Sequence, residues 1–157
     1  MVVKLDGKLP VIRRATRDDV DALAELIDRT VVQSNAPDYP PATLAELRAF
    51  ANPARLLELM ADRECFVAVA GGRIVGTISL GGERLRQMYV APEIQKGGLG
   101  RQLVEFLEAH ARAQGIAELA LHSSLTARGF YERMGYRMIE YLPQGVPTWL
   151  MTKRLSP

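Results

Sequence analysis

The sequence predicts a mixed α/β domain in which helices flank a central β-sheet. Its length of 157 residues, with 48% hydrophobic and 24% charged residues, is that of one globular domain. Segments with the three- and four-residue spacing of amphipathic helices alternate along the chain with short apolar runs of strand length. Helices and strands that alternate in this way pack as the layers of one domain. We therefore expect residues 1–157 to form a single domain.

The first third of the chain predicts a short strand followed by helices. Residues 11–14 have the pattern of a strand, and Thr16 can cap the helix that follows, because its side-chain oxygen accepts a hydrogen bond from a free N–H group. The apolar positions of that helix keep helical spacing up to residues 34–37, where it is expected to end. A second helical region at 42–62 is expected to break near Asn52, because the proline after it cannot continue a preceding turn.

Residues 65–90 predict an antiparallel meander of three strands. Its apolar and β-branched runs are separated by glycine pairs at 71–72 and 81–82, which favour hairpin turns. A Gly-rich loop follows, and then an amphipathic helix that stops at Gly115. The remaining chain predicts a strand at 116–122, a short helix at 126–134, and two closing strands at 136–141 and 149–153.

Composition and charge exclude several classes of protein. The longest apolar stretches are strand-sized, so we expect no transmembrane helix, and residues 1–10 lack the apolar core of a secretory signal. Cys65 is the only cysteine and no Cys/His pair has zinc spacing, so neither a disulfide nor a metal site is expected. A net charge of +2 is too small for a duplex-binding surface, so nucleic acid is not an expected partner. A cytoplasmic protein without a membrane partner fits these features best.

The segment most informative about function is the Gly-rich loop before the predicted long helix. Gly97, Gly98 and Gly100 allow main-chain N–H groups to approach a ligand closely. The first N–H groups of a helix lack internal partners and lie at the positive end of its dipole, so this junction predicts a phosphate site. Lys96 and Arg101 add positive charge. The spacing is neither that of a P-loop nor that of a dinucleotide fold, and a simple tight turn is the alternative.

Two spaced motifs resemble those of the GNAT superfamily of acetyl-CoA-dependent N-acyltransferases. Residues 95–100, Gln-Lys-Gly-Gly-Leu-Gly, match the family's Gln/Arg-x-x-Gly-x-Gly/Ala pattern. Residues 124–136 resemble its Asn-x-x-Ala-x-x-Phe-Tyr-x-x-x-Gly-Phe segment, and residues 12–19 resemble its usual opening. The resemblance covers nearly the whole chain. It implies the GNAT fold, in which the fourth and fifth strands of a mixed sheet splay apart.

The resemblance also implies acetyl-CoA as cosubstrate, without a metal. The pantetheine arm would pair with main-chain groups of Met88 and Val90 in the gap between the splayed strands. The family's asparagine after the fifth strand is Ser124 here, which keeps a hydroxyl donor but lacks the reach of the amide. Ala127 and Tyr131 keep the spacing of the second motif. The pyrophosphate would bind main-chain amides of the loop, at Gln95, Lys96, Gly97, Gly98, Leu99, Gly100 and Arg101.

The activity implied is transfer of an acetyl group to a primary amine of a small molecule or peptide by direct attack. Tyr131 holds the family's general-acid position, and a phenol with a pKa of about 10 suits a departing thiolate; the alternative is a packing role in a Phe-Tyr pair. His122 ends the predicted fifth strand and has a pKa suited to accepting a proton from an ammonium, or it is a structural residue. The family's general-base position falls on Arg84, and the adjacent Glu83 would serve only if a β-bulge restored its direction.

Several alternatives stay open on the sequence alone. Arg84 and Arg86 share a strand face, where they would either hold a carboxylate or phosphate of the acceptor or form a solvated edge. The apolar closing strands around Tyr141 and Trp149 suggest a homodimer, a habit of the family. The competing functions are a non-catalytic acetyl-CoA-binding regulatory module and a partner-binding domain whose Gly-rich loop is only a turn.

Overall fold

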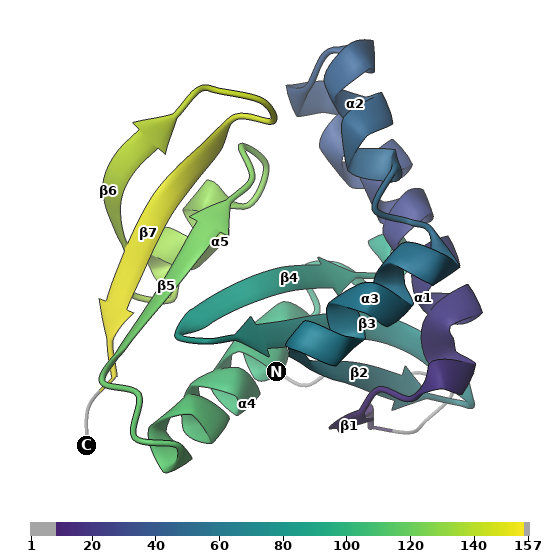
Figure 1. The fold of residues 1–157 in the computed structure, drawn as a ribbon, viewed down its shortest axis with the longest axis horizontal. Coiled ribbons are helices and arrows are strands. Elements are labelled where there is room, and N and C mark those ends of the chain that lie inside the picture. Colours follow the sequence, from purple (N-terminus) through teal and green to yellow (C-terminus); the bar gives the residue numbers. More distant parts are fainter. Residues whose placement is uncertain (1–8, 156–157) are drawn as a thin grey trace.

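The computed structural model describes residues 9–155 and shows a seven-stranded mixed sheet with the order β1-β2-β3-β4-β5-β7-β6 (Figure 1). All neighbouring strands are antiparallel except β4 and β5, which are parallel. Figure 1 shows β1–β4 and β5–β7 as two blades that diverge from a common base. The strands are β1 (Val11–Arg14), β2 (Glu64–Ala70), β3 (Arg73–Gly81), β4 (Arg84–Val90), β5 (Glu118–Ser123), β6 (Arg137–Leu142) and β7 (Thr148–Arg154).

Helices cover both faces of the first blade. Successive side chains of a strand point to opposite faces, and β2 divides its residues accordingly. Phe66 and Ala68 join the core beneath α4, whereas Cys65 and Val67 join the core beneath α1 and α3. The predicted mixed sheet flanked by helices is therefore confirmed. The helices are α1 (Val20–Thr30), α2 (Pro41–Arg48), α3 (Pro53–Asp62), α4 (Leu99–Ala113) and α5 (Arg128–Arg133).

The helices of the N-terminal third begin and break as predicted, but the first ends differently. Asn52 separates α2 from α3 and caps α3, because its Oδ1 accepts the N–H groups of Ala54 and Arg55 at 2.9 and 3.3 Å. Regular α-helix ends at Thr30, and residues 31–35 form a π-helical turn. The Thr30 hydroxyl donates to the Leu26 carbonyl at 2.7 Å, and such back-bonding bends helices. The widened turn directs this segment toward β4.

The sheet opens between β4 and β5. Only Arg84 and Leu85 of β4 are paired with β5, opposite Ala120 and Leu121, and the two strands then separate. The predicted splay of the fourth and fifth strands is therefore present. The main-chain groups of β4 and β5 that face the gap are available to a ligand, because the two strands do not pair with each other beyond Leu85 and Leu121.

A β-bulge in β4 lies immediately after the last of these pairs. Between the pairs Ile78–Met88 and Leu80–Leu85, β3 contributes one residue and β4 contributes two, Arg86 and Gln87. The Gln87 N–H donates to the side chain of the opposing Ser79 at 3.3 Å, which partly compensates the interrupted ladder. A bulge bends its strand and increases the local twist, and here it turns β4 away from β5.

The helix lengths bear on the expectation that the chain has no transmembrane helix. Within residues 9–155, no helix combines the length and apolar character needed to span a membrane.

Candidate active site

The splay opens into a cleft of about 480 Å³. One wall is β4 and the loop after it, and the other is the end of β5 with α5, while the π-helical turn closes one side. The residues that line it are 85–90, 95, 96, 98, 100, 101, 122, 124, 126, 127, 130, 131 and 133, together with 31, 34, 35 and 47. The cleft therefore brings together the Gly-rich loop and the second motif, which lie some thirty residues apart in the chain.

The Gly-rich loop presents the N-terminus of α4 to this cleft. Gly98 precedes the helix with φ of 93°, and Lys96 also has a left-handed φ of 68°. Left-handed residues alternating with right-handed or extended ones turn successive N–H groups to one side, which forms an anion-binding concavity. Leu99 is 1% exposed, and neither it nor Gly97 lines the cleft, so their contribution is limited to main-chain groups. The Arg101 guanidinium forms an ion pair with Glu105 at 2.8 Å, which reduces its free charge.

Two further loop residues have structural roles that the sequence did not predict. The Gln95 side chain donates to the Val90 carbonyl at 3.0 Å and to Ser34 Oγ at 2.9 Å, so it ties the loop to β4 and to the π-helical turn. A Cβ atom at Gly100 would meet the Phe130 ring at 3.4 Å. Glycine at that position thus permits the close approach of α4 to α5.

The main chain of β4 faces the splay at two positions. The Ala91 N–H donates to the Val75 carbonyl at 2.9 Å, which makes this a hydrogen-bonded pair of the β3–β4 ladder. Because hydrogen-bonded and non-hydrogen-bonded pairs alternate in antiparallel sheets, the polar main-chain groups of Val90 and Met88 point away from β3 and toward β5. This is the orientation that pairing with an extended ligand arm requires.

Tyr131 lies on α5 and lines the cleft. Its side chain is 5% exposed and contacts the rings of Phe130 and Tyr136 edge-on, with centroids 5.2 and 5.7 Å away. Burial raises the pKa of the Tyr131 phenol, and the nearby Tyr89 raises it further. The pKa of Tyr89 itself is raised by burial to about 12. Both phenols stay protonated at neutral pH, as a proton donor requires, but the raised pKa makes Tyr131 a weaker acid than a free phenol.

His122 lines the same wall as Tyr131, at the end of β5. Partial burial lowers the pKa of His122 below its ordinary value, and the positive charges of Arg84 and Arg86 lower it further. The imidazole is therefore neutral at pH 7. A neutral imidazole at the cleft surface can accept a proton from a bound ammonium, directly or through water.

The loop between β5 and α5 is held by a hydrogen bond within the loop and by hydrogen bonds from the segment after α1. Ser124 Oγ accepts the Ala127 N–H at 3.1 Å, and the Ser124 side chain also hydrogen-bonds the Tyr39 hydroxyl. The Tyr39 hydroxyl, on a side chain that is 5% exposed, accepts the Leu125 N–H at 2.7 Å. Thr126 Oγ1 donates to an Asp38 carboxylate oxygen at 2.7 Å. The segment after α1 thus anchors the far wall of the cleft, a role of Tyr39 that no local sequence pattern indicates.

The structure does not bring Glu83 to the cleft. Glu83 and Gly82 form the two-residue turn between β3 and β4, and Gly82 has the positive φ of 61° typical of such turns. Glu83 is exposed, and the bulge that could redirect a side chain lies three residues further on, at Arg86. The β4 side chains that reach the cleft near this point are those of Arg86 and Gln87.

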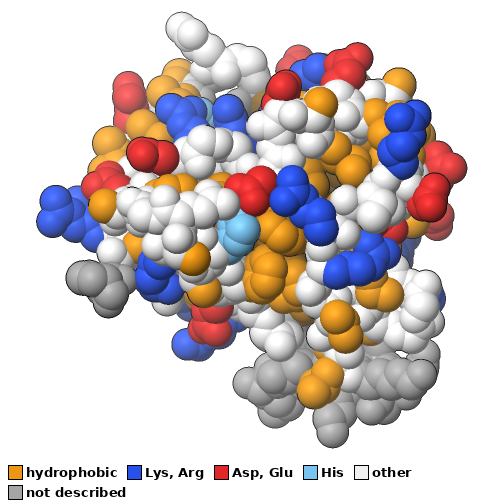
Figure 2. Space-filling model, turned by 60° about the horizontal axis from the view of Figure 1, so that its bottom comes forward, with side chains coloured by type: hydrophobic (Ala, Val, Ile, Leu, Met, Phe, Trp, Pro, Cys, Tyr) orange, Lys and Arg blue, Asp and Glu red, His pale blue; other side chains and the backbone are white. Residues whose placement is uncertain are grey.

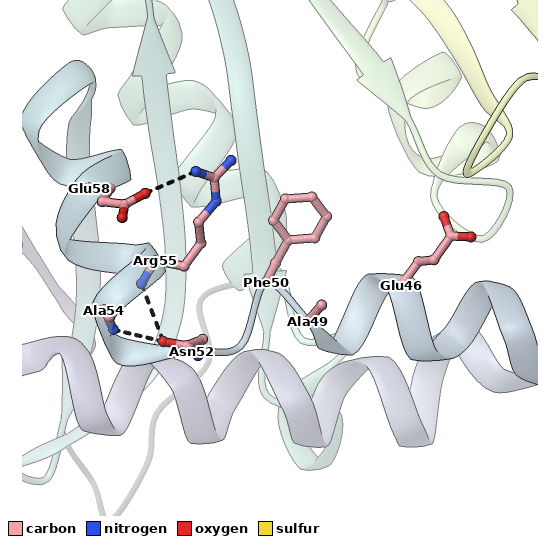
Figure 3. Close-up of a pocket in the computed structure, with 7 residues that line it drawn as sticks. All are labelled: Glu46, Ala49, Phe50, Asn52, Ala54, Arg55 and Glu58. Atoms are coloured by element: carbon pink, nitrogen blue, oxygen red, sulfur yellow. Dashed lines mark hydrogen bonds and ion pairs between the residues drawn. The ribbon is translucent and has the colours of Figure 1, made fainter.

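A second hollow, of about 350 Å³, lies on the outer surface where α2 joins α3 (Figure 3). Its polar groups are largely satisfied by one another, since Arg55 pairs with Glu58 at 3.1 Å and Asn52 caps α3. Phe50 and Glu46 complete the rim. The hollow has no connection to the two sequence motifs. In the part of the chain that the structure describes, no group of three or more His, Cys, Asp or Glu residues could hold a metal ion.

Comparison with known proteins gives one consistent result. The family model of the acetyltransferase (GNAT) domain matches residues 35–155. A Bacillus subtilis protein named as an inferred acetyltransferase is 38% identical over 90 residues, which cover 56% of this chain and 58% of that protein. An uncharacterised N-acetyltransferase of Chlorobaculum tepidum is 36% identical over 96 residues, which cover 54% of this chain and 57% of that protein. The chain thus matches less than three fifths of the length of these curated relatives.

Solved structures agree in fold. The GCN5-related N-acetyltransferase of Rhodopseudomonas palustris superposes with a TM-score of 0.89 at 23% identity, covering 99% of this chain and 98% of that one. The PaiA N-acetyltransferase of Thermoplasma acidophilum, solved in complex with coenzyme A, superposes with a TM-score of 0.80 at 21% identity, covering 92% of this chain and 98% of that one. At these low sequence identities, the structural similarity shows that the fold is shared and nothing more.

Proposed function

Because the chain belongs to the GNAT acetyltransferase family, we propose that it transfers the acetyl group of acetyl-CoA to a primary amine of a small molecule or peptide. The observation that carries this proposal is the cleft in the splay, which has a main-chain anion site at one end and a buried phenol and a neutral imidazole further along it. Each of the three features suits one requirement of the reaction: phosphate binding, protonation of a thiolate and deprotonation of an ammonium.

The cleft fits acetyl-CoA in shape and in chemistry. The N–H groups around Lys96 and Gly98 suit the pyrophosphate, and the main-chain groups of Met88 and Val90 suit the amides of the pantetheine arm. Ser124 lines the opposite wall, where its hydroxyl can bond the same arm by exchanging its hydrogen bond with Tyr39. Acetyl-CoA supplies a thioester carbonyl that a neutral amine can attack, so no covalent enzyme intermediate is needed.

Two side chains move the protons. His122 accepts a proton from the bound ammonium, which frees the nitrogen lone pair. The C–N bond then forms while the C–S bond breaks, and Tyr131 donates its proton to the departing sulfur. The second proton, which the nitrogen loses after the attack, restores the phenol through water, and the His122 imidazolium releases the first proton to solvent, so the products are an amide, free CoA thiol and one proton. The placement of Glu83 in the β3–β4 turn gives no support to its role as the base, and we assign that role to His122.

The competing proposal, a regulatory module that binds acetyl-CoA without turnover, makes a different prediction. Mixing the protein with acetyl-CoA and a panel of primary amines, and following free thiol, separates the two functions. An enzyme releases CoA only when an acceptor amine is present. A binding module shifts its melting temperature with acetyl-CoA and releases no thiol with any amine, and that result would overturn the proposed activity.

We further propose that two copies of the chain pair through β6. Among the described strands β6 is bonded only to β7, and its other edge is free. Met138, Ile139 and Tyr141 are 43%, 51% and 43% exposed along it, an unusual apolar content for an edge strand. Light scattering should give about twice the chain mass of 17.4 kDa, and Ile139→Lys should restore the single-chain mass. A wild-type mass near 17.4 kDa at working concentration would rule the dimer out.

A further inference from the structure

The described residues that line the cleft include several basic side chains and no carboxylate. Arg86, Lys96, Arg101 and Arg133 line it, together with His122, and no aspartate or glutamate does. Elsewhere basic and acidic side chains are interspersed, as on the face shown in Figure 2. Most arginines outside the cleft form ion pairs with carboxylates, whereas in the cleft, among the described residues, only Arg101 does so, with Glu105. The cleft is therefore an exception to the charge balance of the molecule.

One of these cations, Arg86, lies beside the proposed base. The last β4–β5 pair is Leu85 with Leu121, so the next positions along the two parallel strands are Arg86 and His122. Leu85 and Leu121 both point into the core beneath α4, and the side chains that follow them point to the opposite face. Arg86 and His122 thus face the same side of the sheet at the point where the cleft begins.

The Arg86 side chain lies across a glycine and beside a second arginine. A Cβ atom at Gly81 would be 3.2 Å from both Cγ and Nε of Arg86, and 3.6 Å from Cγ of Arg63. The absence of a side chain at Gly81 allows the two arginine stems to converge. Neither guanidinium forms an ion pair with an acidic residue among residues 9–155.

Like charges held this close are unfavourable unless an anion joins them. Burial lowers the pKa of the half-buried Arg63, and Arg86 lowers it further, whereas Cys65 and the adjacent Asp62 raise it by smaller amounts. The same positive field lowers the pKa of His122. An anionic group beside Arg86 would relieve this repulsion, and a guanidinium fork matches the oxygens of a carboxylate or phosphate.

We infer that the acceptor amine belongs to a molecule with a carboxylate or phosphate group, which binds Arg86 while the amine lies at His122. This inference rests on the proposed acetyl transfer and specifies its substrate class. Acceptors with several ammonium groups and no anion are disfavoured by the same charges. Arg63 strengthens the site from the side, and Arg86 makes the direct contact.

Matched acceptors test the inference by their kcat/KM in CoA release. Glycine is compared with glycinamide, and O-phosphoethanolamine with ethanolamine, so that each pair differs in the anion; spermidine represents polycations. We expect the better anionic acceptor to exceed its neutral partner by at least about tenfold, the size of a charge-assisted hydrogen bond. The pair that shows the difference tells whether the bound group is a carboxylate or a phosphate.

Arg86→Met should remove most of the advantage of the anionic acceptor by raising its KM. Arg17→Met, a change at an exposed arginine outside the cleft, should leave that advantage unchanged.

Turnover of the neutral acceptors or of spermidine at least as efficiently as the anionic ones would overturn the inference and leave the proposed acetyl transfer intact.

A second measurement that does not depend on turnover tests the anion site separately from the activity. In CoA-saturated protein, inorganic phosphate should raise the pKa of His122, followed by the imidazole NMR signals and assigned with His122→Asn. The shift should vanish in Arg86→Met. No shift in the wild type, or an equal shift in Arg86→Met, contradicts the anion site whatever the activity.

Discussion

The two ends of the cleft are built from different parts of the polypeptide. At the loop end, main-chain N–H groups are positioned by the left-handed Lys96 and Gly98 and by the start of α4, and the basic side chains of Lys96 and Arg101 flank them. At the end where β4 leaves β5, the groups that face the cleft are the side chains of Arg86 and His122. Tyr131 lies between these ends on α5. Main-chain groups suit a ligand portion that never changes, and side chains suit a portion that a single substitution can respecify.

The largest effect is expected for Tyr131, which lies between the two ends. Tyr131→Phe removes only the hydroxyl and preserves the ring contacts with Phe130 and Tyr136. Loss of a general acid should lower kcat by about 10² to 10⁴, with acetyl-CoA affinity nearly unchanged in calorimetry. Turnover at the wild-type rate with a good acceptor would reduce Tyr131 to a packing residue.

Breaking the loop end should weaken acetyl-CoA binding without specific effects on the acceptor. Gly98→Glu places a side chain at φ of 93° and a negative charge at the helix N-terminus. We expect the Kd for acetyl-CoA to rise by at least about tenfold, equivalent to ~1.4 kcal/mol. Gly72→Glu is the matched control, because Gly72 has φ of 74° in the open β2–β3 turn. Equal Kd values for the two variants would show that the phosphate site lies elsewhere.

The side-chain end should impose a pH dependence. His122 must be neutral to accept a proton, and its pKa lies below the ordinary value, so kcat/KM should rise with pH and reach half of its plateau below about pH 6.5, the ordinary value of a histidine. His122→Asn should remove this acid limb and lower kcat/KM at neutral pH by roughly tenfold, since water can replace part of the role at an exposed site. A limb that persists unchanged in His122→Asn would assign the proton transfer to another group.

The smallest effect concerns the position of Arg86. Gly81→Ala keeps every charge but pushes the Arg86 side chain from its place, since the new Cβ would lie 3.2 Å from Cγ and Nε. An off-rotamer side chain costs about 0.5–1.5 kcal/mol, so KM for an anionic acceptor should rise by about two- to tenfold. Steady-state kinetics with a matched neutral acceptor supplies the control, for which KM should not change.

The same contrast explains what the sequence could predict. The loop end follows from a local motif: three glycines between a strand and a helix indicate an anion site whatever the rest of the fold. Element order and the α2–α3 break at Asn52 are local in the same sense, and the structure confirms them. The splay was expected from the resemblance to the GNAT superfamily, which rests on the two motifs.

The other end depends on contacts that no local pattern reveals. Whether Arg86 faces the cleft is decided by a bulge opposite Ser79 and by the point at which β4 stops pairing with β5. Strand alternation alone left Arg84 and Arg86 equivalent, and only Arg86 lines the cleft. Tyr39 anchors Leu125 across 86 residues of sequence, which only tertiary packing can arrange.

The most direct test of acetyl transfer in this cleft is the stoichiometry of its products. Acetyl-CoA and an accepted amine are incubated with the wild-type protein and with Tyr131→Phe, and mass spectrometry counts the acetylated amine against the free CoA formed. Direct transfer predicts one acetylated amine for each CoA with the wild type, and both products reduced together in the variant. Release of CoA without acetylated amine, or equal product with both proteins, would contradict the account.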